Sequence, residues 1–210
     1  MTITVVDMGI SNLASVLQAF RQIGAPPVQF ATSDNIERAT AIILPGVGAF
    51  GDGMSSLVSK GFVEPLRRAV RAGVPTLGIC LGMQLLADSS EEFGHHDGLG
   101  LIEGQVKRLE SDDRDYRIPN IGWCDVVSEG SSVLFPTADQ RCFYHIHSYH
   151  MVPLDSDVVT GTIAFAGQRC VVAIEKGNLF GVQFHPEKSQ HDGLEVLANF
   201  FAAIPRMRKG

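Results

Sequence analysis

Cys80 is the residue whose surroundings best fit a nucleophile. It lies midway between Gly78 and Gly82, at the end of an apolar run typical of a buried strand and just before leucines at helical spacing. A strand that feeds a helix through a tight turn has the form of a nucleophile elbow. The N-terminus of the helix would favour a thiolate over a thiol. The stretch alone fits equally well a cysteine that is simply buried.

Residues 178–187 supply a possible base and a partner for it. They form an apolar run that ends in His185, Pro186 and Glu187. Residues two apart on an extended chain point the same way, so Glu187 can lie beside His185 and orient its ring. Pro186 lacks an N–H and marks the end of regular strand pairing. Nucleophile, base and orienting acid are the three roles of a catalytic triad, which favours a functional interpretation of Cys80.

The segment Pro45-Gly46-Val47-Gly48 has two interpretations. Its glycines allow backbone N–H groups to turn toward a reacting carbonyl, as in an oxyanion hole. The alternative is an ordinary glycine-rich turn between a strand and a helix. We favour the first interpretation because the segment follows a strand candidate, as Cys80 does.

Three histidines in residues 141–150 raise the question of a metal site. His145 and His147 share one face of a predicted strand, whereas His150 would lie on the other face. No carboxylate nearby completes a metal-binding set. We therefore expect these histidines to form a wall of the active-site cleft, and we expect no metal.

The elements that must position these residues alternate in the first ninety residues. We predict strands at 2–6, 28–30, 41–44 and 74–79, helices at 13–23 and 62–71, and a short helix capped by Ser33 or Asp34. This alternation predicts a parallel sheet covered by helices on both faces. Sites in such sheets form beyond the carboxyl ends of the strands, where residues 45–48 and Cys80 lie.

The second half has a different pattern. We predict short, mainly antiparallel strands at 101–109, 116–118, 124–127 and 141–152, an exposed loop at 112–115, and a C-terminal helix at 193–203. The predicted fold class is α/β, with a mostly parallel central sheet flanked by helices and antiparallel strands in the second half. Residues 1–210 are expected to form one domain.

Composition excludes several classes of protein. The chain is 45% hydrophobic with a formal net charge of −6, which argues against a general nucleic-acid binder. No apolar run approaches the ~20 residues of a membrane span, and the first residues lack the basic start of a signal peptide. The scattered cysteines form no C-x-x-C pair, which argues against a zinc ribbon or a disulfide framework. We expect a cytoplasmic protein.

Taken together, these stretches resemble the class I (triad-type) glutamine amidotransferases. Within that class the chain is most similar to the glutaminase subunits of imidazole glycerol phosphate synthases. The resemblance rests on residues 45–48, 78–84, 118–123, 147–149 and 181–189, which span nearly the whole chain. It implies a flavodoxin-like fold, no cofactor, and hydrolysis of L-glutamine to glutamate and ammonia. The ammonia would pass to a (β/α)₈-barrel cyclase partner in histidine biosynthesis.

The resemblance also implies a role for individual residues. Cys80 would attack the side-chain amide, His185 would move the proton, and Glu187 would hold the imidazole ring. Further roles would fall to the backbone of Leu81 and of Gly46 or Val47 as the oxyanion hole, to Gln84, Ser148 and Tyr149 as the glutamine-binding residues, and to Trp123 and Lys188 on the partner interface. The Gly46–Val47 segment would rest with its N–H turned away until the partner's ligand shifts the population.

Three alternatives remain open at this point. Asn120, Ile121, Cys124 and His150 differ from the usual residues of that subunit, and they lie near the expected partner side. The same glutaminase could therefore feed a different acceptor, such as a sugar-modifying synthase. A cysteine hydrolase or peptidase would use the same elbow without an amino-acid-sized pocket. A catalytically idle scaffold would need no intact triad.

Overall fold

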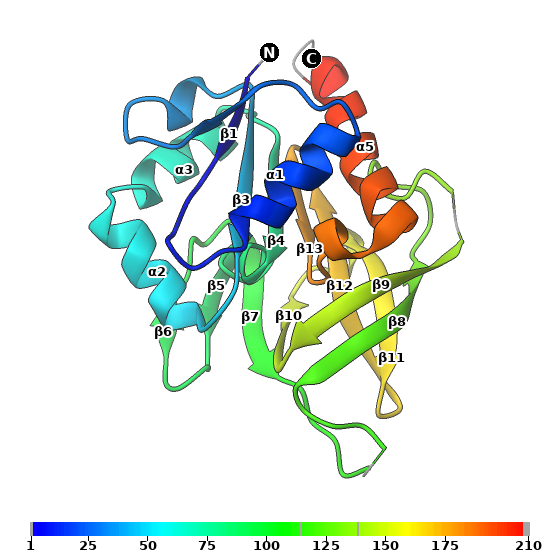
Figure 1. Cartoon of the computed structure of the whole chain (residues 1–210). Coiled ribbons are helices and arrows are strands. Elements are labelled where there is room, and N and C mark those ends of the chain that lie inside the picture. Colours follow the sequence, from blue (N-terminus) through cyan, green and yellow to red (C-terminus); the bar gives the residue numbers. More distant parts are fainter. Residues whose placement is uncertain (1, 114, 138, 208–210) are drawn as a thin grey trace.

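The computed structural model describes residues 2–113, 115–137 and 139–207, and a nine-stranded sheet is its central element (Figure 1). In pairing order the strands are β2 (Val28–Phe30), β1 (Ile3–Val5), β3 (Ala41–Gly46), β4 (Thr76–Cys80), β13 (Leu179–Val182), β12 (Gln168–Lys176), β11 (Val159–Phe165), β8 (Asn120–Ser128) and β9 (Gln140–His147). The run from β2 to β13 is parallel and the rest is antiparallel.

A smaller sheet lies beside the carboxyl end of β4. Its strands, in pairing order, are β10 (Tyr149–Pro153), β7 (Ile102–Arg108), β5 (Ala87–Ser90) and β6 (His96–Asp97). It begins shortly after the elbow and is completed by the strand that follows β9. The small sheet therefore brings residues 149–153 close to Cys80, although some seventy residues separate them in the chain.

Helices cover both faces of the large sheet. They are α1 (Leu13–Gln22), α2 (Phe50–Ser59), α3 (Val63–Arg71), α4 (Leu81–Gln84) and α5 (Gln190–Met207), with 3₁₀ turns η1 (Ile36–Arg38), η2 (Ser156–Val158) and η3 (Pro186–Lys188). Helices α1 and α5 lie side by side on one face, and α2 and α3 lie on the other (Figure 1). No helix in the described ranges is long and apolar enough to cross a bilayer.

Alternating side chains of the central strands explain this layering. In β3, Ile43 belongs to the core under α1 and α5, whereas Ile42 and Leu44 belong to the core under α2 and α3. All three side chains are fully buried. A strand buried on both faces needs apolar residues at every position, which is why β3 and β4 read as continuous apolar runs.

Most elements predicted for the first half are confirmed. The exceptions are the short helix after residue 34, the unpredicted helix α2, the helix after Cys80, which is shorter than predicted, and the unpredicted strand β5. The predicted short helix after residue 34 is a single 3₁₀ turn that begins after Asn35 and has no side-chain cap. Helix α2 was not predicted, because Gly51, Asp52 and Gly53 in its first turn are poor helix formers. Packing of Phe50 and Leu57 into the core stabilises it instead.

The second-half predictions contain two further errors. Residues 116–118 form no strand. The strand predicted at 141–152 is two strands, β9 and β10, in different sheets, and Ser148 separates them. A change of sheet leaves no mark on hydrophobic alternation, so the pattern alone could not reveal it.

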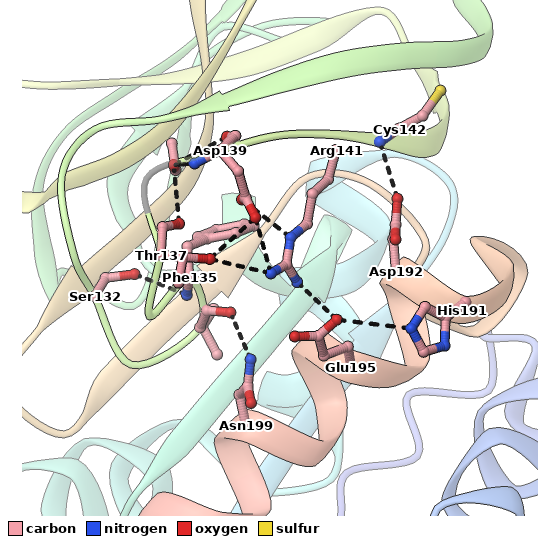
Figure 2. Close-up of polar contacts among 12 residues, drawn as sticks. Ser132, Phe135, Thr137, Asp139, Arg141, Cys142, His191, Asp192, Glu195 and Asn199 are labelled. Atoms are coloured by element: carbon pink, nitrogen blue, oxygen red, sulfur yellow. Dashed lines mark hydrogen bonds and ion pairs between the residues drawn. The ribbon is translucent and has the colours of Figure 1, made fainter.

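A polar network attaches the N-terminal part of α5 to β9 (Figure 2). Arg141 contacts Asp139 through Nε at 3.0 Å and Glu195 of α5 through Nη1 at 3.1 Å. Asp192 of α5 accepts a hydrogen bond from the backbone N–H of Cys142 at 3.2 Å. Because β9 is an edge strand of the large sheet, these contacts satisfy part of its free edge and fix the segment that joins β13 to α5.

Candidate active site

Cys80 lies at a strained turn where β4 meets α4. Its φ of 54° and ψ of −113° are unusual for a residue with a side chain, which is typical of a nucleophile elbow. A Cβ on Gly78 would lie 2.6 Å from the carbonyl oxygen of Gly82, and one on Gly82 would overlap the carbonyl oxygen of Leu44. Both glycines are therefore required by close backbone packing around the cysteine.

The helix after the elbow is shorter than the leucine spacing predicts. Helix α4 is one turn, and Leu85 and Leu86 are fully buried in the stretch that leads from α4 to β5. One turn aligns few peptide dipoles. A thiolate at Cys80 would therefore depend less on the helix than on a charged neighbour.

His185 is that neighbour. Its Nδ1 lies 2.8 Å from Oε1 of Glu187, and only 2% of either side chain is exposed. Burial by itself would lower the pKa of His185, but interactions with Cys80 and Glu187 outweigh it and raise the pKa to about 10. In the described part of the chain Nε2 of His185 has no hydrogen-bond partner within bonding geometry, so it is free to exchange a proton with a group in the pocket.

The chain after β13 is held so that this histidine faces the elbow. The backbone N–H of His185 donates to the carbonyl of Tyr144 in β9 at 2.9 Å. The hydroxyl of Ser189 accepts from the N–H of Tyr144 at 2.9 Å and donates to the carbonyl of His185 at 2.7 Å. Both backbone groups of Tyr144 are thereby tied to the segment that carries His185 and Glu187.

A pocket of about 210 Å³ opens above the cysteine. The residues that line it come from five separate stretches of the chain and are Val47, Gly48, Cys80, Leu81, Gln84, Glu92, Ile146, His147, Ser148, Tyr149, His185 and Lys188. Three residues that the sequence suggested do not line this pocket. Glu187 lies behind His185, Gly46 of β3 pairs with Cys80 of β4, and Trp123 lines a neighbouring hollow. The topology thus gathers the predicted residues around one small cavity.

In the glycine-rich segment, the N–H of Val47 is engaged by a residue that does not line the pocket. The N–H of Val47 donates to the carbonyl of Ile10 at 2.9 Å. This N–H is therefore engaged by the loop after β1 and would have to leave that bond before it could bind an oxyanion. Gly46 is tightly packed, since a Cβ there would lie 3.1 Å from Cβ of Leu81.

Glu92 is a pocket residue that sequence reasoning missed. It is half-buried, and its Oε2 accepts from the N–H of Phe50 at the start of α2 at 2.7 Å. Burial raises the pKa of its carboxyl group. Residues 91–100 looked like a polar loop, and only the structure shows that this acidic group enters the pocket, where it could pair with an ammonium group.

Of the three histidines predicted to form the wall of the cleft, only His147 lines the pocket, and His145 lies fully buried beside it. Nδ1 of His145 lies 3.2 Å from Nε2 of His147, and Nδ1 of His147 lies 3.0 Å from the carbonyl oxygen of Tyr149. Burial lowers the pKa of His145 well below its usual value and that of His147 to about 4. His147 is thus a neutral ring in the wall of the pocket, and His145 is a buried neighbour that contacts it. Across the described ranges, no cluster of three or more His, Cys, Asp or Glu residues could hold a metal ion.

Trp123 and Lys188 lie near one another at the rim. Nζ of Lys188 is 5.8 Å from the centre of the Tyr144 ring, and that ring packs edge-on against Trp123 at 6.0 Å. Trp123 is 49% exposed, and so are Ile121 and Ile146 to a similar degree. The mouth of the pocket is thus bordered by an apolar and aromatic surface with one cation.

Comparisons with known proteins agree with this geometry. Residues 4–204 match the family model "Glutamine amidotransferase class-I". The chain is 46% identical over 199 residues to imidazole glycerol phosphate synthase subunit HisH of Moorella thermoacetica, covering 94% of this chain and 93% of that one. It is 43% identical over 206 residues to the HisH subunit of a Synechocystis species, covering 96% of each.

Solved structures show the same fold at lower identity. A crystal structure of a glutamine amidotransferase superposes with a TM-score of 0.74 at 18% identity, covering 96% of this chain and 98% of that one. The structure of PurLQS from Thermotoga maritima gives a TM-score of 0.73 at 20% identity, covering 96% and 97%. The predicted α/β fold is confirmed. The chain belongs to the class I glutamine amidotransferase family and, within it, to the HisH subunits of imidazole glycerol phosphate synthase.

Proposed function

We propose that this chain is a single-domain glutaminase that hydrolyses L-glutamine to glutamate and ammonia. The observation that carries the proposal is the strained Cys80 beside a His185–Glu187 pair in one small pocket. A charged imidazole ring close to a thiol favours the thiolate, which is the nucleophilic form. A pocket of about 210 Å³ suits a substrate the size of an amino acid better than a peptide.

In the proposed mechanism His185 takes the thiol proton, and the sulfur of Cys80 attacks the carboxamide carbon. His185 then returns the proton to the leaving nitrogen, which departs as ammonia and leaves a thioester on the sulfur. Water hydrolyses the thioester with His185 as the base, and glutamate is released. Glu187 holds Nδ1–H of the ring throughout, which keeps Nε2 directed toward the reacting atoms.

Binding of glutamine is assigned to the other polar groups of the pocket. We assign the α-amino group to Glu92 and the remaining polar contacts to Gln84, Ser148 and Tyr149, because all four line the cavity. The carboxylate of Glu92 is the one acidic group among these lining residues and so suits an ammonium group.

The oxyanion hole is proposed to be incomplete in the resting chain. Leu81 can offer its backbone N–H from the elbow, whereas Val47 donates to Ile10. Turning the N–H of Val47 toward the substrate would add a second donor, and removing one oxyanion-hole donor costs about 2.7–4 kcal/mol in a serine protease. Glutaminase activity would then be low until a partner or its ligand shifts the segment.

The acceptor of the ammonia is proposed to be a (β/α)₈-barrel cyclase subunit in the cytoplasm. The HisH relatives are named as subunits of imidazole glycerol phosphate synthase, which supports a two-subunit enzyme of histidine biosynthesis. Trp123, Tyr144, Ile146 and Lys188 form an apolar and cationic rim around the pocket, which is suited to a docked partner. A partner seated there would close the pocket and receive the ammonia.

The test is the glutaminase rate of the chain alone and with the cyclase of the same organism and its nucleotide substrate. We expect strong stimulation by the complete mixture, and we expect free ammonium to replace the chain in the cyclase reaction. Hydrolysis that ignores the cyclase would assign the ammonia to another acceptor. No hydrolysis in any mixture would refute the proposed function.

A further inference from the structure

Gln183 is a buried side chain that the mechanism above does not use. It is fully buried, and its Nε2 donates to Sγ of Cys80 at 3.7 Å, a length normal for a hydrogen bond to sulfur. This is the one hydrogen bond that the described residues make to the sulfur. A primary amide held against the nucleophile by the fold requires an explanation.

The sheet itself brings the two residues together. Strands β4 and β13 are parallel neighbours, and Val182 at the end of β13 pairs with Ile79. The next residue of each strand is therefore Gln183 on one side and Cys80 on the other. The N–H of Gln183 donates to the carbonyl of Val172 at 2.8 Å, which fixes the backbone from which the side chain projects.

A chain of hydrogen bonds determines which end of the amide meets the sulfur. The carbonyl oxygen of Tyr149 only accepts, so it requires the NH₂ group of Gln84, which donates at 2.9 Å. The same NH₂ group donates its second hydrogen to Oε1 of Gln183 at 2.9 Å. Once that oxygen is engaged, the NH₂ group of Gln183 must face Sγ of Cys80. The orientation is thus set from the backbone of β10.

We propose that Gln183 is a further catalytic residue, whose amide N–H donates to the sulfur of Cys80 and stabilises the thiolate that attacks glutamine. A hydrogen bond to the charged form of a group favours that form, and the effect is larger in a dry environment. His185 supplies the charge and takes the proton, whereas Gln183 supplies a fixed donor that holds the sulfur in position. This inference rests on the proposed glutamine hydrolysis at Cys80.

The test compares Gln183→Met with the wild-type chain, both in the mixture with cyclase and nucleotide. Methionine has nearly the same length and no N–H donor. We expect kcat to fall about tenfold, because the donor to the sulfur is lost. A change in KM is not used as a criterion in this variant, because Gln84, which is assigned to glutamine, loses its hydrogen bond to Oε1 of Gln183 as well. Gln29→Met is the matched control, because Gln29 lies on the edge strand β2 and donates to Thr4 of β1, with β3 between β1 and the cysteine strand β4. This control should leave kcat and KM unchanged.

A second measurement is independent of glutamine hydrolysis. The rate of Cys80 alkylation by iodoacetamide is followed against pH by mass spectrometry of the peptide that contains it. We expect the pH of half-maximal rate to rise in Gln183→Met and to stay unchanged in Gln29→Met. The other charged or titratable groups that face the sulfur across the pocket are His185 with Glu187 behind it, Glu92, His147, Tyr149 and Lys188, and all of them are the same in both variants.

Gln183→Glu covers the case in which the methionine variant does not fold. Glutamate keeps the length and the acceptor for Gln84 but places a carboxylate oxygen at the sulfur. We expect a loss of kcat of about a hundredfold and a larger upward shift of the alkylation profile. Wild-type kcat together with an unchanged alkylation profile in a folded Gln183 variant would overturn the inference. If the wild-type chain hydrolyses no glutamine, the proposed function fails, and the alkylation profile still tests the contact with Gln183.

Discussion

At the scale of single residues, the chemistry depends on one strained cysteine. Cys80→Ser is expected to abolish glutaminase activity, by at least about a thousandfold, because the triad acts as a unit. The substitution changes one buried atom at a turn fixed by Gly78 and Gly82, so the fold should be retained. The measurement is the activated glutaminase rate together with thermal unfolding of both chains. Glutamine hydrolysis at the wild-type rate would show that the nucleophile is another residue.

His185 should affect the rate of the chemical step rather than binding. His185→Asn is expected to lower kcat by two or more orders of magnitude with KM within about threefold, because the ring moves the proton and substrate contacts lie elsewhere. The matched control is His191→Asn on α5, whose side chain is 89% exposed and whose loss should leave both constants unchanged. An effect confined to KM would contradict a role in proton transfer.

The residues that the sequence could reveal are those with local patterns. Cys80 stands out by its glycines and His185 by the partner two residues away. Glu92 and the orientation of Gln183 could not be found in this way, because their meaning depends on strands brought together from distant parts of the chain. The sequence pattern of a polar loop, or of an apolar strand, is the same whether or not that segment lines a pocket.

At the scale of elements, the segment between β13 and α5 is positioned by its contact with β9. Ser189→Ala removes the hydroxyl that links the backbone of Tyr144 to that of His185. We expect kcat to fall about tenfold with little change in KM, and the free energy of unfolding to fall by about 1–3 kcal/mol for the unpaired buried groups. Steady-state kinetics of the activated enzyme and urea unfolding provide both quantities.

Two companion variants separate positioning of His185 from docking of α5. Asp192→Ala also removes a side-chain acceptor from the edge of β9, but it acts on Cys142 and touches no part of His185. It should lower stability and leave kcat unchanged. Ser189→Thr keeps the hydroxyl and should restore most of kcat. An equal loss of kcat in Asp192→Ala would show that docking of α5, and not the serine hydroxyl, governs the rate.

Elements also show where hydrophobic patterns fail. Strands β3 and β4 could be predicted because burial on both faces leaves a continuous apolar run. The length of α4 could not be predicted. Leu81, Leu85 and Leu86 have helical spacing, but they are buried in one core to which residues of both sheets contribute. Burial in the tertiary structure overrides local propensity at the elbow, which is also where the backbone is strained.

At the scale of the whole molecule, buried histidines make stability depend on pH in opposite directions. The pKa of His147 is lowered to about 4 and that of His145 lies well below its usual value, so the unfolded chain binds more protons than the folded chain between about pH 6.5 and 4. Their contribution is fully present above pH 6.5 and is lost as the pH falls toward 4. His185, with a pKa near 10, contributes stability that is fully present below pH 6.5 and is lost as the pH rises toward 10.

Replacement of one buried histidine should therefore make the free energy of unfolding depend less strongly on pH below neutrality. His145→Phe removes a titrating ring but keeps an aromatic side chain beside Phe184, whose ring centre lies 5.8 Å away. The free energy of unfolding, measured in urea between pH 7 and pH 4.5, should fall less steeply with acid, by up to about 1.4 kcal/mol per pH unit. His191→Phe, which changes an exposed ring, should leave the slope unchanged. Equal slopes in the wild-type chain and His145→Phe would mean that His145 can be protonated in the folded molecule, because only then would its titration no longer favour the unfolded chain.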